Sequence, residues 1–212
     1  MTVAGETDET EEEREWKKLL GLIRTHATLK AEPGTLFTLP SGAKTDTYID
    51  IKLASMRSNV QFLLARRLHE ALLSFWPVDA VAGVVLGGCH LASIVALYAA
   101  ELQQRFNTSL LDVLYIRKER SDHGLRNLVE GPVLKGMRVV LCEDVVTTGG
   151  SSMKAVGHLR EVGCEVQGVL AVIDRRRDTS ETLSDGTKVL GLFTLDEFLY
   201  DGINMKTGEP LR

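Results

Sequence analysis

Residues 139–151 read VVLCEDVVTTGGS, and this stretch decides what kind of fold the chain can form. Its first four residues are apolar, which is typical of a buried strand. Two adjacent acids, Glu143 and Asp144, follow at the carboxyl end of that strand. A turn rich in hydroxyl groups and glycine comes next and leads into a helical pattern. Because open α/β sheets bind ligands beyond the carboxyl ends of their strands, the stretch predicts a ligand site.

The turn that follows the two acids has the chemistry of an anion site. Backbone N–H groups, two threonine hydroxyls and a helix N-terminus together suit a phosphate group. Two carboxylates beside a phosphate would be repelled by it, so we expect them to face sugar hydroxyls or a bound Mg²⁺. The stretch lacks the lysine of an ATP-type P-loop and contains no G-x-G-x-x-G pattern. The residues alone therefore indicate a ribose-phosphate ligand.

On both sides of this stretch, apolar strands alternate with helical patterns. Strands are expected at 79–87, 110–118, 138–145, 165–175 and 188–195, and helices at 90–106, 153–163 and 196–200. Before them we expect a helix at about 11–30, two short strands within 32–52, and a helix from 58 or 59 to about 76. Residues 119–134 are polar and predict a long loop. This alternation indicates an α/β fold with a mainly parallel sheet flanked by helices.

Length and composition limit the class of protein. The chain has 212 residues, 44% of them apolar and 25% charged, which is typical of one soluble globular domain. No apolar run reaches the roughly 20 residues that a membrane span needs, and the acidic start is unlike a signal peptide. The three cysteines are far apart, which argues against a disulfide scaffold or a cysteine-rich zinc site. We therefore expect a cytoplasmic protein without a membrane partner.

The acidic charge is concentrated near the N-terminus. The net charge is −4, and residues 6–15 carry seven acidic residues and one basic residue. The rest of the chain is therefore close to +2, which predicts no basic face and no nucleic-acid partner. We expect an acidic, disordered tail at 1–10, followed by a single domain at 11–212.

Residues 139–151 resemble the phosphoribosyl-pyrophosphate (PRPP) motif of the type I phosphoribosyltransferases. Residues 37–50, residues 115–124 and the pair Asp174-Arg175 resemble segments of the orotate phosphoribosyltransferases, in the same order. The resemblance implies a type I phosphoribosyltransferase fold with a small N-terminal hood at about 11–55. It also implies transfer of the phosphoribosyl group from PRPP to orotate, giving orotidine 5′-monophosphate and pyrophosphate in UMP biosynthesis. Mg²⁺ is the implied cofactor.

The resemblance also implies roles for the PRPP-binding residues. Glu143 and Asp144 would bind the ribose hydroxyls, and the turn after them would hold the 5′-phosphate. The glycine-containing segment 83–88 would approach the diphosphate with its backbone, because residues without Cβ allow close approach. The full implied PRPP set is Gly87, Gly88, Glu143, Asp144, Val145, Val146, Thr147, Thr148, Gly149, Gly150 and Ser151.

The resemblance also implies which residues bind the base and which take part in the chemical step. The implied orotate set is Tyr48, Ile49, Thr147 and Arg175, and the guanidinium of Arg175 would meet the orotate carboxylate. The implied catalytic set is Arg117, Lys118, Arg120, His123 and Asp144. Its cations would neutralise the departing pyrophosphate. In the family this loop closes over the site of a neighbouring subunit, which implies a homodimer with loop exchange.

The chain departs from the family pattern in the loop and after Arg175. Ser121 stands where the family usually has a lysine, with Arg120 beside it. Residues 176–178 replace the usual Glu-Gly-rich continuation. Two alternatives stay open: a type I phosphoribosyltransferase for another base, and a PRPP-binding regulator with reduced turnover. Arg175 argues against a purine, which has no carboxylate, whereas the missing loop lysine favours the regulator.

Overall fold

The computed structural model describes residues 10–38, 42, 44–118, 127–176 and 180–199. The chain divides into two compact units, with the boundary between Leu63 and Leu64 inside helix α3 (Ser58–Leu72). Of the expected acidic tail, only Thr10 lies within the described residues. Its hydroxyl accepts a hydrogen bond from the Glu13 backbone N–H at 3.2 Å, and the Glu13 carboxylate accepts one from the Thr10 N–H at 2.9 Å. This capping box begins the first helix.

The first unit combines two helices with short strand pairs. Helix α1 (Glu11–Ala27) buries Leu19, Ile23 and Ala27 and packs against α2 (Ile51–Ser55). Strand β1 (Thr28–Lys30) pairs antiparallel with β4 (Thr47–Ile49), and β2 (Phe37–Thr38) pairs antiparallel with β3 (Lys44–Thr45). The helix expected at about 11–30 is confirmed as far as Ala27. Among its described residues, the segment expected to hold two short strands contains three, β2, β3 and β4, and β1 precedes it.

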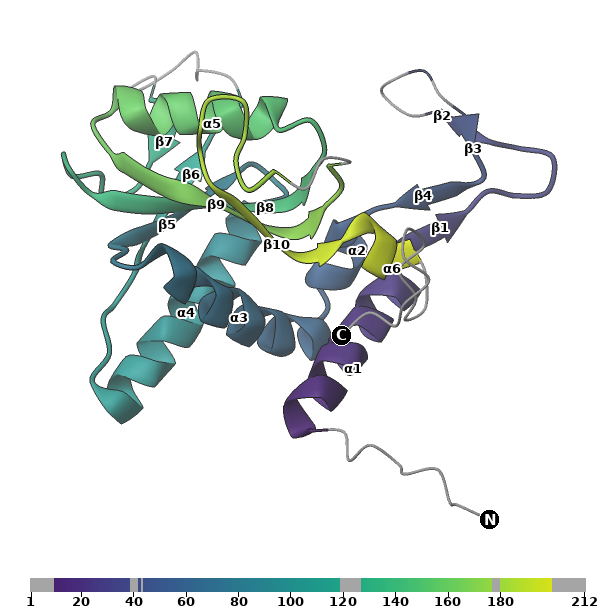
Figure 1. Cartoon of the computed structure of the whole chain (residues 1–212), viewed down its shortest axis with the longest axis horizontal. Helices are drawn as coiled ribbons and strands as arrows, with labels where there is room; N and C mark the ends of the chain where they lie inside the picture. The colour runs from purple at the N-terminus through teal and green to yellow at the C-terminus, as the bar shows by residue number, and fades with distance from the viewer. Residues whose placement is uncertain (1–9, 39–41, 43, 119–126, 177–179, 200–212) are drawn as a thin grey trace. The chain divides into compact units, whose positions relative to one another are not determined.

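The second unit is built on a six-stranded sheet in the order β10-β9-β8-β5-β6-β7 (Figure 1). Its strands are β5 (Ala80–Val84), β6 (Asp112–Ile116), β7 (Val129–Glu130), β8 (Arg138–Val146), β9 (Glu165–Asp174) and β10 (Val189–Thr194). All neighbouring pairs are parallel except β6 and β7. The expected mainly parallel sheet is confirmed.

Helices cover both faces of this sheet. Helix α4 (Cys89–Phe106) lies on one face and α5 (Gly150–Glu161) on the other (Figure 1). The central strands β8 and β9 are buried on both faces, which explains their continuous apolar sequences. The 3₁₀ turn η1 (Leu73–Phe75) follows α3, and α6 (Leu195–Leu199) follows β10.

The strand order places a ligand crevice at the carboxyl ends of β5 and β8. From β5 the chain passes through α4 to β6 on one side, whereas β8 lies on the other side of β5. The connections that leave β5 and β8 therefore run to helices on opposite faces of the sheet. A crevice opens at such a switch point, and it is where open α/β sheets bind their ligands.

Two details differ from the expectations. Strand β7 lies inside the segment 119–134 that was expected to be a loop; it pairs with the end of β6 at the sheet edge. Helix α5 begins at Gly150, three residues before the expected start, because the glycine turn belongs to its first turn. Among the described helices, none combines the length and the apolar character required to cross a membrane.

Candidate active site

The loops that follow β5 and β8 lie directly against each other. A Cβ atom at Gly88 would overlap the carbonyl oxygen of Cys142 in β8. A Cβ atom at Gly87 would lie only 2.5 Å from Oδ2 of Asp144, so a larger residue would have to displace that carboxylate. Glycine at both positions therefore brings the backbone of residues 85–88 beside the acid pair. The structure brings the expected diphosphate loop and the expected ribose-binding acids together.

Glu143 is a buried carboxyl group at the end of β8. Only 6% of the residue is exposed, and its Oε1 accepts a hydrogen bond from the Ser152 hydroxyl at 3.1 Å. Burial raises the pKa of Glu143 to about 7, and repulsion by Asp144 adds to the rise. The Ser152 hydrogen bond and the positive charge of Lys118 act in the opposite direction. A ligand that donates hydrogen bonds to Glu143 would favour its charged form.

Asp144 and the turn after it lie at the carboxyl end of β8. The Asp144 side chain is half-buried, and its Oδ1 accepts a hydrogen bond from the Val145 backbone N–H at 2.9 Å. Thr147 and Thr148 are exposed. Gly149 has a φ of +76°, the left-handed conformation that favours glycine, and no side chain caps α5 there. The first N–H groups of α5 are thus placed to meet an anion.

Arg175 follows β9 at the same edge of the sheet. Its backbone N–H donates a hydrogen bond of 2.8 Å to the carbonyl oxygen of Val146, which ties it to the end of β8. The Nε atom of Arg175 is buried and has no hydrogen-bond partner among the described residues. An unsatisfied buried donor costs free energy, so this guanidinium is suited to donate a hydrogen bond to an oxygen atom of a ligand.

Of the expected catalytic cations, Arg117 and Lys118 are described, whereas Arg120 and His123 lie outside the described residues. The Arg117 Nε atom pairs with Oε1 of Glu130 at 3.0 Å, which joins the residue after β6 to the end of β7. Lys118 is exposed, and its charge acts on Glu143. Lys118 is therefore a described loop cation whose positive charge acts on Glu143.

Tyr48 and Ile49, from the expected orotate set, belong to β4 of the first unit. Tyr48 lies opposite Leu29 in the pairing with β1, and its ring packs against Phe37 with the ring centres 5.7 Å apart. Asp50, the next residue, caps α2 by accepting a hydrogen bond from the Lys52 N–H at 3.0 Å. The strand thus holds Tyr48 firmly within its own unit.

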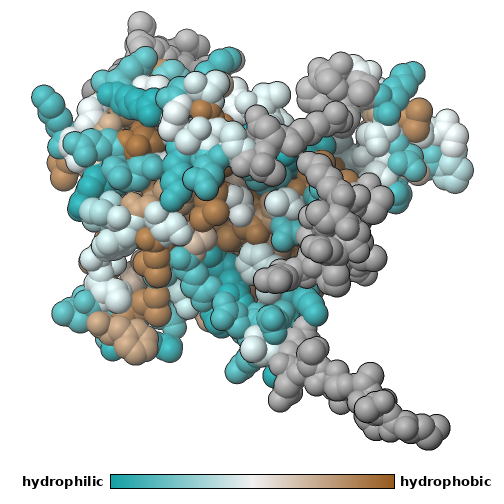
Figure 2. All heavy atoms as spheres, in the orientation of Figure 1, coloured by the Kyte–Doolittle hydropathy of each residue, from teal (hydrophilic) through white to brown (hydrophobic). Residues whose placement is uncertain are grey.

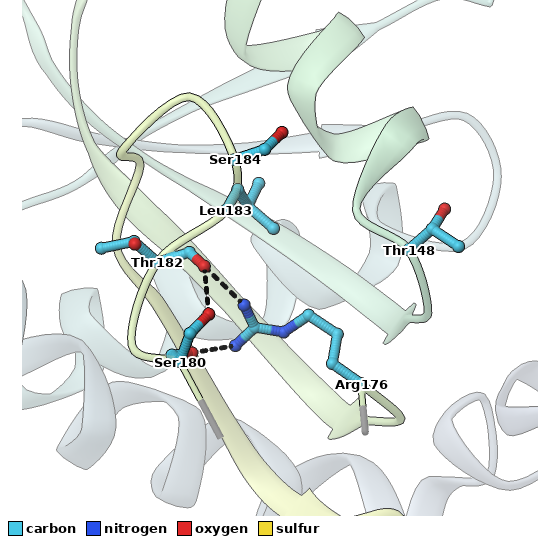
Figure 3. A pocket seen from close by; sticks show the side chains of 6 residues that line it. All are labelled: Thr148, Arg176, Ser180, Thr182, Leu183 and Ser184. Carbon is cyan, nitrogen blue, oxygen red and sulfur yellow. Dashed lines mark hydrogen bonds between the residues drawn. The ribbon is translucent and has the colours of Figure 1, made fainter. Parts of the chain in front are cut away.

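Sequence reasoning missed two contributors to this edge of the sheet. Ser152 is fully buried and orients Glu143, but it lies one residue beyond the stretch that carried the resemblance. Arg176 was noted only as a departure from the family pattern. Figure 3 shows its guanidinium directed at Ser180 and Thr182 in a pocket of about 230 Å³ that Thr148 also lines. No spacing rule links residue 176 to that segment.

Replacing Glu143 with glutamine is expected to stabilise the free protein at pH 8 and to have little effect near pH 4. The unfolded chain loses this proton near pH 4.5, but the folded protein keeps it until about pH 7. The stability contributed by the protonated carboxyl is therefore lost as the pH rises through this window, by roughly 3 kcal/mol at most. Thermal unfolding of both proteins from pH 4 to 8 tests this. An equal difference in Tm at both ends would contradict the buried, protonated carboxyl.

Comparison with known proteins identifies the family to which this fold belongs. The phosphoribosyl transferase domain family matches residues 56–195. The orotate phosphoribosyltransferase of Sorangium cellulosum strain So ce56 is 42% identical over 166 residues, which cover 77% of this chain and 84% of that protein. The orotate phosphoribosyltransferase of Aquifex aeolicus strain VF5 is 35% identical over 186 residues, covering 87% of this chain and 98% of its own.

A solved structure agrees with the sequence comparisons. The Mycobacterium tuberculosis H37Rv orotate phosphoribosyltransferase, in complex with PRPP, superposes with a TM-score of 0.67 at 26% identity. The match covers 87% of this chain and 98% of that one. The fold is therefore that of a type I phosphoribosyltransferase. The chain belongs to the phosphoribosyl transferase family and, within it, to the orotate phosphoribosyltransferases, so the resemblance seen in the sequence is confirmed.

Proposed function

We infer that this protein transfers the phosphoribosyl group of PRPP to orotate, giving orotidine 5′-monophosphate and pyrophosphate in pyrimidine biosynthesis. The observation that carries this conclusion is the acid pair at the end of β8, packed against Gly87 and followed by a glycine turn that opens α5. Family membership identifies orotate as the base that is used, since the matched relatives are orotate phosphoribosyltransferases.

PRPP would bind along the carboxyl edge of the sheet. Glu143 and Asp144 accept hydrogen bonds from the ribose hydroxyls, and the turn 145–151 surrounds the 5′-phosphate with N–H and hydroxyl donors. The backbone of residues 85–88 meets the diphosphate. Support for this arrangement comes from the burial of Glu143 and from the contact between Gly87 and Asp144. We also assign Thr147, which belongs to this turn, to the side of the site where the base would bind.

Orotate would be recognised through its carboxylate. Arg175 offers a guanidinium whose Nε atom is buried without a hydrogen-bond partner among the described residues. A carboxylate supplies the missing acceptor and an opposite charge. For Tyr48 and Ile49 we propose the roles that the family resemblance implies, in which they would present a ring and a backbone group to the base. This chemistry selects orotate over purines and over uracil, which lack the carboxylate.

The reaction needs no covalent nucleophile. The orotate nitrogen attacks the anomeric carbon while the bond between that carbon and the diphosphate oxygen breaks, through an oxocarbenium-like state. The bond electrons leave with the diphosphate, and the proton of the attacking nitrogen passes to that leaving group. Catalysis then rests on positioning and on stabilising the negative charge of the leaving group. We assign one of these positive charges to Lys118, and the effect of its charge on the pKa of Glu143 supports this assignment. Arg117, Arg120 and His123 complete the proposed set of catalytic loop residues.

Mg²⁺ is the cofactor that this chemistry calls for. The ion prefers oxygen ligands and is commonly bound through substrate phosphates with few protein carboxylates. The crevice fits such a complex, because it offers carboxylate and hydroxyl oxygens beside a phosphate turn. When bound, the ion would supply positive charge next to the diphosphate. Asp144 keeps the ribose in place while the bond to that group breaks.

We propose that the enzyme is a homodimer whose catalytic loop serves the site of the partner subunit. Large apolar side chains stand exposed on and just after α4, where Figure 2 shows a brown area; they include Leu97, Phe106 and Leu110, each more than 60% exposed. A surface of this kind favours burial against a second protein. The proposed location is the cytoplasm, supported by three unpaired cysteines.

Mixing two inactive variants tests the loop exchange. Lys118→Ala removes a loop cation, and Asp144→Asn disables the ribose site. After subunit exchange, half of the dimers pair one subunit of each kind, and one site in each such dimer is intact, so roughly a quarter of the wild-type activity should return. No recovery, with exchange proven by differently tagged subunits, would show that each chain closes its own site.

A panel of bases tests the proposed function against its alternatives. Purified protein with PRPP and Mg²⁺ is offered orotate, uracil, adenine and hypoxanthine, and pyrophosphate release is measured. We expect release with orotate alone. Turnover of another base would support the broader phosphoribosyltransferase alternative. PRPP binding without any turnover would support the regulator alternative that Ser121 keeps open.

A further inference from the structure

Arg176 holds a segment of the chain that covers the phosphate turn. Its guanidinium pairs with the Asp174 carboxylate, with Nη2 and Oδ2 2.7 Å apart, and donates hydrogen bonds of 2.9 Å to the carbonyl oxygens of Ser180 and Thr182. Only 8% of the Arg176 side chain is exposed. Figure 3 shows both of these carbonyl contacts from the one side chain. Arg176 thus joins the end of β9 to the segment 180–184.

The segment held by Arg176 touches the phosphate turn through Leu183. The Cβ position of Gly149 is filled by Cδ2 of Leu183, which is 5% exposed and belongs to the core beneath α5. Gly149 is the left-handed residue at which α5 begins, and its carbonyl oxygen accepts the Met153 N–H at 2.8 Å. Leu183 therefore packs on the residue that directs the first N–H groups of α5 toward a phosphate.

A second arginine fixes the other end of the same segment. Arg160 of α5 donates to Oδ2 of Asp185 at 2.9 Å and to the Thr187 hydroxyl at 3.0 Å. The Leu183 N–H donates to the Thr187 carbonyl oxygen at 2.8 Å, which closes a tight turn. With this end already held by α5, Arg176 determines how closely the segment around Leu183 approaches Gly149.

We propose that Arg176 is a positioning residue for the 5′-phosphate of PRPP, acting through Leu183 on the turn at Gly149. This proposal rests on the proposed function, because it assumes that the turn binds that phosphate. Four of the five guanidinium N–H groups donate to Asp174 or to the carbonyl oxygens of Ser180 and Thr182. We therefore assign Arg176 to holding the segment beside the turn rather than to direct contact with the ligand. Removing it frees the segment 180–184 and loosens the phosphate turn, while the backbone of residues 85–88, where the diphosphate binds, is left as it was.

Two ligands and one matched control test the proposal. Ribose 5-phosphate probes the turn, and pyrophosphate probes the loop at 85–88; the Kd of each is measured by calorimetry with Mg²⁺. Arg138→Ala is the control: Arg138 makes a similar paired contact with Asp79, with Nε and Oδ2 2.8 Å apart, at the amino end of β8. It should lower the Tm without changing either Kd, since it lies at the opposite edge of the sheet.

Arg176→Ala is expected to raise the Kd for ribose 5-phosphate roughly tenfold while the Kd for pyrophosphate stays within about twofold. Arg176→Lys should recover part of the loss, because lysine can pair with Asp174 but cannot bridge both carbonyl oxygens. Leu183→Ala should raise the Kd for ribose 5-phosphate and leave the Kd for pyrophosphate unchanged. This variant tests the contact between Leu183 and Gly149 if Arg176→Ala fails to fold. Unchanged or equally weakened binding of both ligands overturns the proposal. A wild-type protein that binds neither ligand overturns the proposed function itself.

Discussion

Asp144→Asn is expected to weaken PRPP binding roughly a hundredfold while the fold survives, because hydrogen bonds to a charged group are worth about 1.5–3 kcal/mol each. The carboxylate lies at the end of β8, beside the turn that opens α5, and the proposed function assigns it to the ribose hydroxyls. The asparagine oxygen can still accept the Val145 N–H, which the carboxylate now does at 2.9 Å. Calorimetry with PRPP and Mg²⁺ measures the affinity, and thermal unfolding confirms the fold. Unchanged affinity in a folded variant would rule out this role.

Gly87→Ala reaches the same carboxylate from the other side and serves as a companion to Asp144→Asn. Its Cβ would lie 2.5 Å from Oδ2 of Asp144 and would displace that group. Because both changes act on one contact, their effects on PRPP affinity should be far from additive in the double variant. Additive losses would show that Gly87 acts on PRPP independently of Asp144.

Arg175→Ala is expected to lower kcat/KM for orotate by roughly tenfold to a hundredfold, the loss that follows from removing a charge-assisted hydrogen bond to a carboxylate. The KM for PRPP should change little, because the guanidinium is assigned to the base. The position of Arg175 is fixed by its 2.8 Å backbone hydrogen bond to Val146, so the deletion leaves the strand pairing intact.

A surface arginine supplies the control for this variant. Arg105 of α4 has a 66% exposed side chain paired with Glu101, and Arg105→Ala should leave both kinetic parameters unchanged. Arg175→Lys should retain little of the activity, since a lysine lacks the planar fork that matches a carboxylate. Orotate turnover that is undiminished in Arg175→Ala would place the carboxylate at another residue.

The sheet of the second unit was predictable from sequence because its central strands are buried on both faces. Val139 to Cys142 form a continuous apolar run for that reason, and acids follow where the strand meets the crevice. Strand β7 was missed because two residues in a polar segment carry no periodicity, and their pairing with Tyr115 and Ile116 is fixed by tertiary contacts.

The sequence predicted which residues belong to the candidate site, but it did not predict the hydrogen bonds and packing contacts between them. Glu143 and Asp144 stand next to each other in the sequence, and their role follows from chemistry and position. The Ser152 hydrogen bond, the Leu183 contact with Gly149 and the partners of Arg176 depend on segments meeting in space. Neither residue pattern nor spacing encodes such contacts, so they required the structure.

The proposed transfer of the phosphoribosyl group to orotate is tested by measuring the formation of orotidine 5′-monophosphate from orotate and PRPP. Purified wild-type protein is incubated with both substrates and Mg²⁺, and the nucleotide and pyrophosphate are quantified together, with Asp144→Asn as the matched inactive protein. We expect the two products to appear in equal amounts with the wild type and the variant to form little of either. Folded wild-type protein that binds PRPP but forms no orotidine 5′-monophosphate would contradict it.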